Sequence, residues 1–514
     1  MSKTIIIIGA GLAGLSAALQ AAENGCNVKL VSSLPSERAQ SVMAEGGINA
    51  ALNTKDENDS PEEHFTDTIK AACGLADPNA VWGMTQAAPE LVHWLLKLGV
   101  KFNMSGYDDV DLRNFGGQKK KRTAFAQSDT GKQIMTAMID AVRRKEASGM
   151  VERFSHHSFL TLRLCGNICC GCVIRDEYSQ ETVELPGDAV IVATGGMHGL
   201  FGNTTGSLSN TGEVTAELFR LGVPLANGEM IQYHPTTVKC GGKRMLISEA
   251  ARGEGGRLFA MKDGKQWYFM EEKSPELGNL MPRDITAREI WKVSHESEVF
   301  LDMTEISEEI ISNKLSGLAD DCMTYLHKDI RKEPVSVLPG IHYFMGGILV
   351  DEQHRTPIQN LYAAGECCAQ YHGANRLGGN SLLGALYGGR VAAKSACEQA
   401  DVVDLSCATQ IDFPPASQIS EIKQLNKVMQ ETMGVVRNEN TLLNGIQTVQ
   451  ALTGNLPLLG MAVLKSALAR KESRGAHWRE DYPKSNDDDY LKTTVARFDG
   501  KQIQISFVPV PERR

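Results

Sequence analysis

The chain has 514 residues, of which 42% are hydrophobic and 22% are charged, and its formal net charge is −9 at pH 7. This length exceeds what one hydrophobic core can serve, so we expect two or three domains. The acidic balance argues against a nucleic-acid partner, and no apolar run approaches the roughly 18 residues that would span a bilayer.

The first 31 residues predict a β-strand, a glycine-rich turn, a helix and a second strand. Residues 4–8 are fully apolar, Gly9-Ala10-Gly11-Leu12-Ala13-Gly14 follows, and an alanine-rich helix runs to about Asn24 before the strand at residues 27–31. This βαβ start is typical of a dinucleotide site, where the glycines allow a tight turn and close approach of the pyrophosphate. Because the first strand begins directly after Lys3, we expect no secretion signal and a cytoplasmic protein.

The second strand ends in Ser32-Ser33, without the acidic residue that usually holds a ribose, which argues against a simple NAD site. The loop at residues 34–53 contains Gly46-Gly47, which permits close backbone approach to a planar ligand. Helical patterns then occupy about 63–74, 79–98 and 131–147. The charge run at residues 119–122 is interpreted as a solvated loop.

Four of the twelve cysteines lie close together, at Cys165, Cys169, Cys170 and Cys172. They could hold a metal, but alternation from Thr161 to Asp176 around Gly166-Asn167 favours a β-hairpin with half-buried cysteines. A chain without a secretion signal is expected to keep its thiols reduced. We therefore predict no metal site.

Two later strands end in glycine and predict a bipartite nucleotide-binding sheet. Residues 188–193 lead into Thr194-Gly195-Gly196, and residues 361–364 lead into Gly365-Glu366. Between them, residues 218–340 carry their own strands and helices. We therefore expect an α/β fold with a Rossmann-like nucleotide domain in two parts, 1–217 and 341–405, an inserted α+β capping domain at 218–340, and a C-terminal helical domain and tail at 406–514. Pro414-Pro415 indicates a linker, residues 417–473 are helical in pattern, and Gln502 to Val508 predicts a last strand.

The inserted segment and residues 341–382 contain cationic and hydroxyl side chains suited to carboxylates. Arg376 offers a bidentate fork, and the others offer single hydrogen bonds: His234, Ser248 and His342. Such a set is suited to a ligand that carries carboxylate groups.

The motifs together resemble the flavoprotein subunits of the succinate dehydrogenase/fumarate reductase family, which includes L-aspartate oxidase. They are Gly-Ala-Gly-Leu-Ala-Gly, Ala-Glu-Gly-Gly, Ala-Thr-Gly-Gly, Gln-Tyr-His-Pro-Thr, Glu-x-x-Arg-Gly-Glu-Gly-Gly, Pro-Arg-Asp, His-Tyr-x-Met-Gly-Gly and His-Gly-Ala-Asn-Arg-Leu-Gly-Gly-Asn-Ser-Leu, and they cover nearly the full length. The resemblance implies hydride transfer between FAD and a fumarate/succinate pair. It implies Arg283 as proton donor, Glu249 and Arg252 as its proton relay, and Phe115 as a shield of the substrate from water. The residues expected to contact FAD are Gly9, Ala10, Gly11, Leu12, Ala13, Gly14, Ser32, Ser33, Gln40, Ser41, Ala44, Glu45, Gly46, Gly47, Ala193, Thr194, Gly195, Glu213, Glu366, Ser381 and Leu382.

Two departures from the family pattern refine this expectation. The position of the histidine that binds FAD covalently in membrane-complex members is Gln40, which has no nucleophilic ring nitrogen, so we predict non-covalent FAD and a bias toward fumarate reduction. L-Aspartate oxidase remains the alternative, although Gln133 stands where that enzyme carries a glutamate suited to an amine, with Asp129 nearby. A flavin-binding subunit without chemistry is disfavoured by the intact set of site residues.

The tail beginning at Glu472 resembles the ends of dehydrogenase and reductase subunits that exchange electrons with an iron–sulfur subunit. This chain lacks ferredoxin-type cysteine spacing, so the clusters would lie on a partner chain. Any link to a membrane would also come through a partner.

Overall fold

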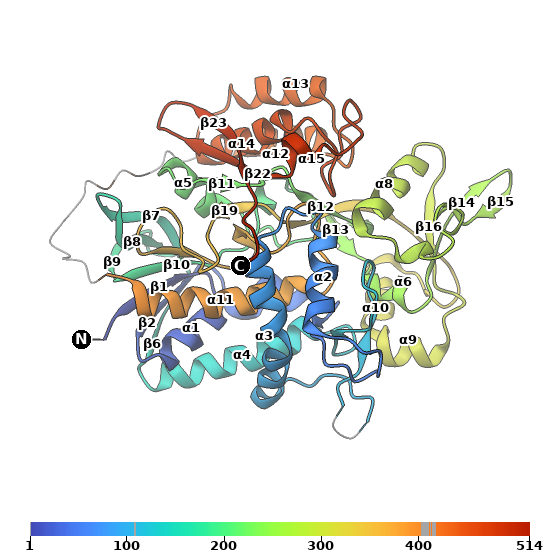
Figure 1. Ribbon diagram of the computed structural model, residues 1–514, viewed down its shortest axis with the longest axis horizontal. Coiled ribbons are helices and arrows are strands. Elements are labelled where there is room, and N and C mark those ends of the chain that lie inside the picture. Colours follow the sequence, from blue (N-terminus) through green and yellow to red (C-terminus); the bar gives the residue numbers. More distant parts are fainter. Residues whose placement is uncertain (1, 107–108, 402–410, 412, 414–417) are drawn as a thin grey trace.

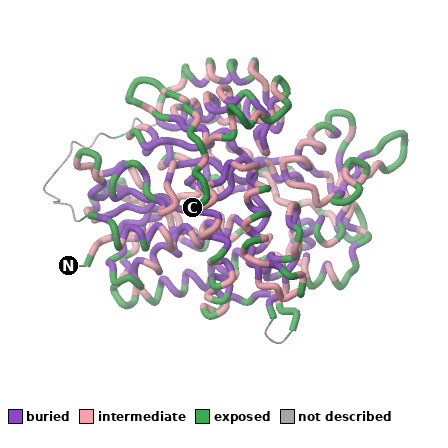
Figure 2. The backbone as a smooth tube through the Cα atoms, in the orientation of Figure 1, coloured by how far each residue is buried: buried purple, intermediate pink, exposed green. Residues whose placement is uncertain are grey.

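The structure is a computed structural model that describes residues 2–514 except 107–108, 402–410, 412 and 414–417. The linker predicted at Pro414-Pro415 lies outside the described residues. Figure 1 shows the blue and orange segments together around one sheet, the yellow-green segment to one side of it and the red C-terminal segment above it. Buried backbone runs through all three regions in Figure 2. The predicted α/β class is confirmed.

A five-stranded parallel sheet in the order β20-β10-β1-β2-β6 forms the centre of the first region. In the register of this sheet, Ile7 pairs with Ile191 on one side and Leu30 on the other. Most positions of β1, β10 and β20 are buried, because a parallel sheet covered on both faces requires apolar side chains on both. The strands, in sheet order, are Leu361–Ala363, Ala189–Val192, Thr4–Ile8, Asn27–Ser32 and Val151–Ser155.

Helices α1 (Leu12–Glu23) and α11 (Asn380–Gln399) pack together on one face of this sheet, with α3 (Pro78–Leu98) and α4 (Thr130–Ala147) in the same core. Glycine allows helix α1 to pack closely against the turn that precedes it. A Cβ added at Gly14 would lie 1.8 Å from the carbonyl oxygen of Gly9, so a larger residue would push helix α1 away from the turn that precedes it.

The antiparallel sheet β7-β8-β9 covers the other face and contains the predicted hairpin. Its strands are His157–Cys165, Ile168–Asp176 and Thr182–Pro186. Cys169 and Cys172 are buried in the apolar core, and no three His, Cys, Asp or Glu side chains in the described part of the chain are grouped to hold a metal ion. The expectation of reduced thiols is wrong at Cys165, which is disulfide-bonded.

The inserted region contains two sheets and the helices around them. The first places β12 (Ile231–Cys240) between β13 (Lys243–Leu246) and β18 (Leu338–Phe344). The second has the order β15-β14-β16-β17, with strands Lys265–Trp267, Arg257–Lys262, Val299–Asp302 and Val335–Ser336. Helices α6 (Glu249–Gly253) and α8 (Arg283–Val293) carry Glu249 and Arg283 of the site, and β12 and β18 carry its histidines. Pairing of β12 with β18 therefore brings the two histidine segments together.

The C-terminal region contains the predicted helices, α12 (Ile419–Thr432), α13 (Glu439–Val449) and α14 (Asn455–Ala469), and ends in a hairpin. Strand β23 (Ile503–Pro509) was predicted, whereas β22 (Lys492–Phe498) was not. Strand β22 pairs with β11 (Leu225–Ala226) and so joins the tail to a five-stranded sheet that also contains β19 (Gly347–Leu349) and β21 (Cys368–Ala369). A fully buried ion pair, Arg470 Nε to Glu229 at 2.7 Å, lies beneath this junction.

One surface prediction is wrong. Arg122, at the end of the charge run, is fully buried, and its guanidinium lies 2.8 Å from Asp59 and 2.9 Å from Asp67. The two carboxylates compensate the buried charge of Arg122. Both lie more than 50 positions before it, so the local charge pattern at residues 119–122 does not reveal them. None of the helices in the described residues combines the length and the apolar character needed to cross a membrane.

Candidate active site

One cavity of about 1070 Å³ brings the predicted nucleotide and carboxylate residues together. It extends from the turn after β1, past the N-terminus of α11, to the paired strands β12 and β18. The predicted residues that line it are Gly9, Ala10, Gly11, Leu12, Ala13, Ser32, Ser33, Gln40, Ser41, Ala44, Glu45, Gly46, Gly47, Phe115, Ala193, Thr194, Gly195, Glu213, His234, Ser248, Glu249, Arg283, His342, Glu366, Arg376, Ser381 and Leu382. Gly14 and Arg252 are buried beside it and do not line it.

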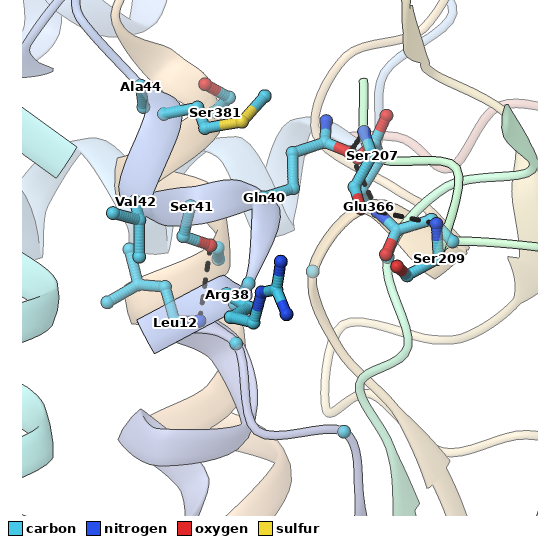
Figure 3. A pocket seen from close by; sticks show the side chains of 18 of the residues that line it. Leu12, Arg38, Gln40, Ser41, Val42, Ala44, Ser207, Ser209, Glu366 and Ser381 are labelled. Atoms are coloured by element: carbon cyan, nitrogen blue, oxygen red, sulfur yellow. Dashed lines mark hydrogen bonds between the residues drawn. The ribbon is translucent and has the colours of Figure 1, made fainter. Parts of the chain in front are cut away.

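The nucleotide end of the cavity is shaped by backbone and small side chains. Ser41 Oγ accepts a hydrogen bond from the backbone N–H of Leu12 at 3.3 Å, which fixes the loop against the first turn of α1 (Figure 3). The hydroxyl of Ser32 is buried and has no hydrogen-bond partner among the described residues. An unsatisfied buried hydroxyl at the end of β2 suits a ligand that supplies the missing partner.

The N-terminus of α11 is held at the cavity by a buried amide network. Asn49 donates to the carbonyl of Gly378 at 2.7 Å and to the side chain of Asn380 at 2.8 Å. Asn380 also contacts His64 Nε2 at 2.9 Å. A helix N-terminus presents unpaired N–H groups and a partial positive charge, so this end of α11, where Ser381 and Leu382 line the cavity, favours a ligand group that carries negative charge.

Phe115 lies between the two ends of the cavity, almost fully buried. A Cβ at Gly46 would lie 3.1 Å from its ring, so glycine is what allows the loop to pack against it. Arg113, which the sequence did not single out, donates to the carbonyls of Glu45 and Gln127 and lies over the Phe125 ring. The guanidinium therefore fixes the loop that carries the glycine pair.

The carboxylate end is dominated by a buried ion pair between α8 and α6. Arg283 Nε donates to Glu249 at 2.7 Å, and Arg283 Nη1 donates to the side chain of Gln232 at 3.1 Å. The second Glu249 oxygen accepts from the backbone N–H of Gly116 at 2.9 Å and lies 3.6 Å from Arg252 Nη2. Burial alone would raise the pKa of Glu249, but the charges of Arg283 and Arg252 outweigh it and the pKa is lowered. Glu249 is therefore an anion between two cations.

Two histidines face this ion pair, His234 from β12 and His342 from β18, with ring centroids 5.1 Å apart. Burial and the positive charge of Arg283 hold the pKa of both rings well below the usual 6.5. Both are consequently neutral at physiological pH and act as hydrogen-bond donors or acceptors. Ser248 caps α6 by accepting from the backbone N–H of Ala250 at 3.4 Å.

Arg376 is a further cationic group and, like Arg283, it lines the cavity. Its guanidinium lies 4.5 Å from the centroid of the Tyr343 ring, and its Nε is buried without a partner among the described residues. Burial and the nearby charge of Arg283 lower the pKa of Arg376 to about 9, which still leaves it charged at neutral pH. A buried, charged, incompletely bonded arginine is a ready site for a carboxylate.

Gln232 and Tyr343 are site residues to which the sequence motifs assign no role. Gln232 donates to the backbone carbonyl of Arg376 at 2.9 Å as well as accepting from Arg283, so it holds both arginines in place. Its position two residues before His234 on β12 was the available signal, since side chains two apart on a strand share a face.

Comparison with known proteins agrees with this geometry. Residues 4–382 match the family model described as FAD binding domain, and residues 452–513 match the one described as fumarate reductase flavoprotein C-term. The chain is 38% identical to the succinate dehydrogenase flavoprotein subunit of Bacillus subtilis, an alignment that covers 100% of this chain and 98% of the relative. This chain belongs to the succinate dehydrogenase/fumarate reductase flavoprotein family. It is an FAD-dependent oxidoreductase of that family.

Two further members of the flavoprotein family are similar to this chain over nearly its full length. The 8-methylmenaquinol:fumarate reductase flavoprotein subunit of Wolinella succinogenes is 32% identical over 100% of this chain and 92% of its own. The solved structure of quinol fumarate reductase from E. coli superposes with a TM-score of 0.90 at 27% identity, covering 99% of this chain and 97% of that one.

The residues of this flavoprotein fit FAD. The glycine turn after β1, the unpaired hydroxyl of Ser32 and the glycine pair at Gly46 leave room and donors along one continuous cavity.

Proposed function

We propose that this chain is the catalytic flavoprotein subunit that interconverts fumarate and succinate, works mainly in the direction of fumarate reduction, and exchanges electrons with an iron–sulfur partner. The observation that carries the proposal is the set of two arginines and two neutral histidines at one end of the FAD cavity. This set matches a dicarboxylate in charge.

The side chains divide into binding and proton-transfer roles. Arg376 forms a bidentate contact with one carboxylate, and His234, His342 and Ser248 supply single hydrogen bonds. Developing negative charge in the transition state is stabilised by donors that are already oriented. Reduced FAD supplies the hydride.

Arg283 delivers the proton to the neighbouring carbon. A free guanidinium is a weak acid, because its pKa is above about 12. Glu249 accepts a hydrogen bond from Arg283 Nε and lies beside Arg252, which is behind it and away from the cavity, so after each turnover the carboxylate can take up a proton from the Arg252 side and pass it to Arg283. Phe115 closes the space between these groups and the nucleotide end, which limits the entry of water.

The residue at position 40, Gln40, supports fumarate reduction as the main direction. Its side chain is an amide, so it makes no covalent bond to FAD, and without that bond we expect a lower flavin potential that favours electron flow to fumarate. The partner is supported by the names of the relatives, which are subunits of larger enzymes. We infer that the clusters and any membrane contact belong to those other chains.

Three assays on the purified holoenzyme test the proposal: reduced viologen with fumarate, succinate with an artificial acceptor, and L-aspartate with oxygen. We expect fast fumarate reduction, slower succinate oxidation and no aspartate oxidation. Aspartate turnover that exceeded fumarate turnover would identify an L-aspartate oxidase instead.

A pair of matched variants on the same helix tests the role of Arg283. Arg283→Lys should lower fumarate turnover by about 100-fold or more, because proton transfer typically contributes at least this factor. Arg288→Lys should leave it nearly unchanged, since Arg288 packs on Trp478 and does not line the cavity. Full turnover by Arg283→Lys would remove Arg283 from the mechanism.

A further inference from the structure

Gln40 bonds to the opposite wall of the cavity. Its side-chain oxygen accepts one hydrogen bond from the backbone N–H of Ser207 at 2.9 Å and a second from the amide of Asn210 at 2.8 Å. Figure 3 shows Gln40 extending from its short helix toward Ser207 across the cavity. An amide oxygen has two lone pairs and can accept both bonds, whereas a neutral histidine nitrogen could accept only one.

The loop that Gln40 holds leads directly to the substrate histidine. Two residues before Ser207, Thr205 donates from its backbone N–H to the carbonyl of Ile341 at 3.0 Å. The Thr205 hydroxyl lies 2.8 Å from Nδ1 of His342 and 3.4 Å from the same Ile341 carbonyl. The backbone bond therefore fixes Thr205 beside strand β18, and the shorter side-chain contact is the one to His342.

The direction of the Thr205–His342 hydrogen bond decides what the ring presents to the cavity. A neutral imidazole carries one N–H, and the ring nitrogen that meets a carboxylate must be the one that donates. If Nδ1 carried the proton, Nε2 would present a lone pair to the substrate anion and repel it. Nδ1 must then be the acceptor, with the Thr205 hydroxyl as its donor.

We infer that Thr205 is a positioning residue that holds His342 in the tautomer protonated on Nε2, and that Gln40 keeps Thr205 in place by anchoring its loop. The inference rests on the proposed dicarboxylate site and adds to it. It gives the amide at position 40 a task of its own, which is to link the cofactor loop to the substrate histidine.

The tautomer can be measured on the wild-type holoenzyme without any variant. Nitrogen-15 NMR of histidine-labelled protein with bound malonate distinguishes protonated from unprotonated ring nitrogens, and the His342→Gln spectrum assigns the signals. We expect an unprotonated Nδ1 and a protonated Nε2 at His342. A protonated Nδ1 would overturn the inference, and this reading is independent of whether the enzyme reduces fumarate.

Variants of Thr205 test the consequence for binding. Thr205→Val removes the hydroxyl at nearly constant volume, and we expect the KM for fumarate to rise about tenfold, with a much smaller change in kcat, because a hydrogen bond to a buried acceptor is lost. Thr205→Ser keeps the hydroxyl and should restore KM. A KM for Thr205→Val within twofold of the wild type would contradict the inference, while a wild type that turned over no dicarboxylate would contradict the proposed function.

A double-mutant cycle tests the path through the loop. Gln40→Leu removes the acceptor, and we expect a severalfold rise in KM, whereas Gln40→Glu retains acceptor oxygens and should restore it. Because both positions act through one loop, the double variant Gln40→Leu/Thr205→Val should show a KM no higher than Thr205→Val alone. Effects that multiply in the double variant would show that Gln40 does not act through Thr205.

Discussion

Arg283 and Glu249 form a buried ion pair in which Arg283 Nε lies 2.7 Å and Nη2 2.6 Å from the same carboxylate oxygen. The two residues come from different helices, α8 and α6, and only Arg283 and Glu249 of this cluster reach the cavity, while Arg252 stays behind. This is the geometry that the proposed function requires, in which Arg283 donates a proton and the hydrogen-bonded Glu249 passes a new one to it.

Glu249→Gln should reduce kcat for fumarate by about 100-fold or more, because the amide cannot return a proton to Arg283. Steady-state kinetics with reduced viologen, with the FAD content of each preparation measured, would check this. The control is Glu271→Gln, which removes a partly exposed ion pair with Arg257 in the same region and should change kcat little. A Glu249→Gln enzyme as fast as the control would exclude Glu249 from proton transfer.

We expect FAD to be released completely when the holoenzyme is precipitated with acid. The resemblance aligns Gln40 with the histidine that binds FAD covalently in membrane-complex members, and the Gln40 side chain is already bonded to Ser207 and Asn210. The measurement is flavin fluorescence in the washed pellet and on a denaturing gel. Fluorescence that remained with the polypeptide would show covalent attachment elsewhere.

Buried neutral histidines predict a loss of stability in weak acid. Burial lowers the pKa of His64 to about 3 and of His354 to about 4. Below pH 6.5 the unfolded chain binds protons that these native rings do not, so stability falls as the pH decreases. The expected loss is about 2 kcal/mol for each histidine at pH 5. Urea unfolding at pH 5 and pH 7 should show a smaller difference for His64→Gln than for the wild type, and no such change for His295→Gln, an exposed site.

The carboxyl group of Glu45 predicts the opposite pH dependence of stability. Burial, together with the nearby Asp321, raises the pKa of Glu45 to about 8, so the native FAD-free protein holds a proton at neutral pH that the unfolded chain has released. Stability is then lost as the pH rises toward 8. In the FAD-free protein, Glu45→Gln should remove a loss of about 3 kcal/mol between pH 5 and pH 8. Thermal unfolding at both pH values measures this difference, and Glu37→Gln, at an exposed site, is the control. If the stability of Glu45→Gln depended on pH as that of the wild type does, Glu45 would not be the group that holds the proton.

The local pattern predicted most elements of the fold. The apolar run at β1, the glycines after it and the helix α11 that starts near Ser381 were all found where expected, because each depends on neighbours in the sequence. Strands β6 and β22 were missed. Many of their side chains are only partly buried, so neither strand shows a clear alternation of apolar and polar residues. In addition, β22 is a strand because it pairs with β11, which is more than 260 positions away in the sequence.

The sequence by itself determined the family, the cofactor class and the motif residues of the cavity, since these follow from short motifs whose glycines, histidines and arginines have specific physical tasks. The tertiary structure decided which of those residues touch. Gln40 bonds to Asn210 across 170 positions, and Thr205 reaches His342 across 137. Such contacts depend on the pairing of β12 with β18 and on the path of one loop over the cavity, and a hydrogen bond forms only when both partners are placed to within a few tenths of an ångström. No local pattern in the sequence specifies that placement.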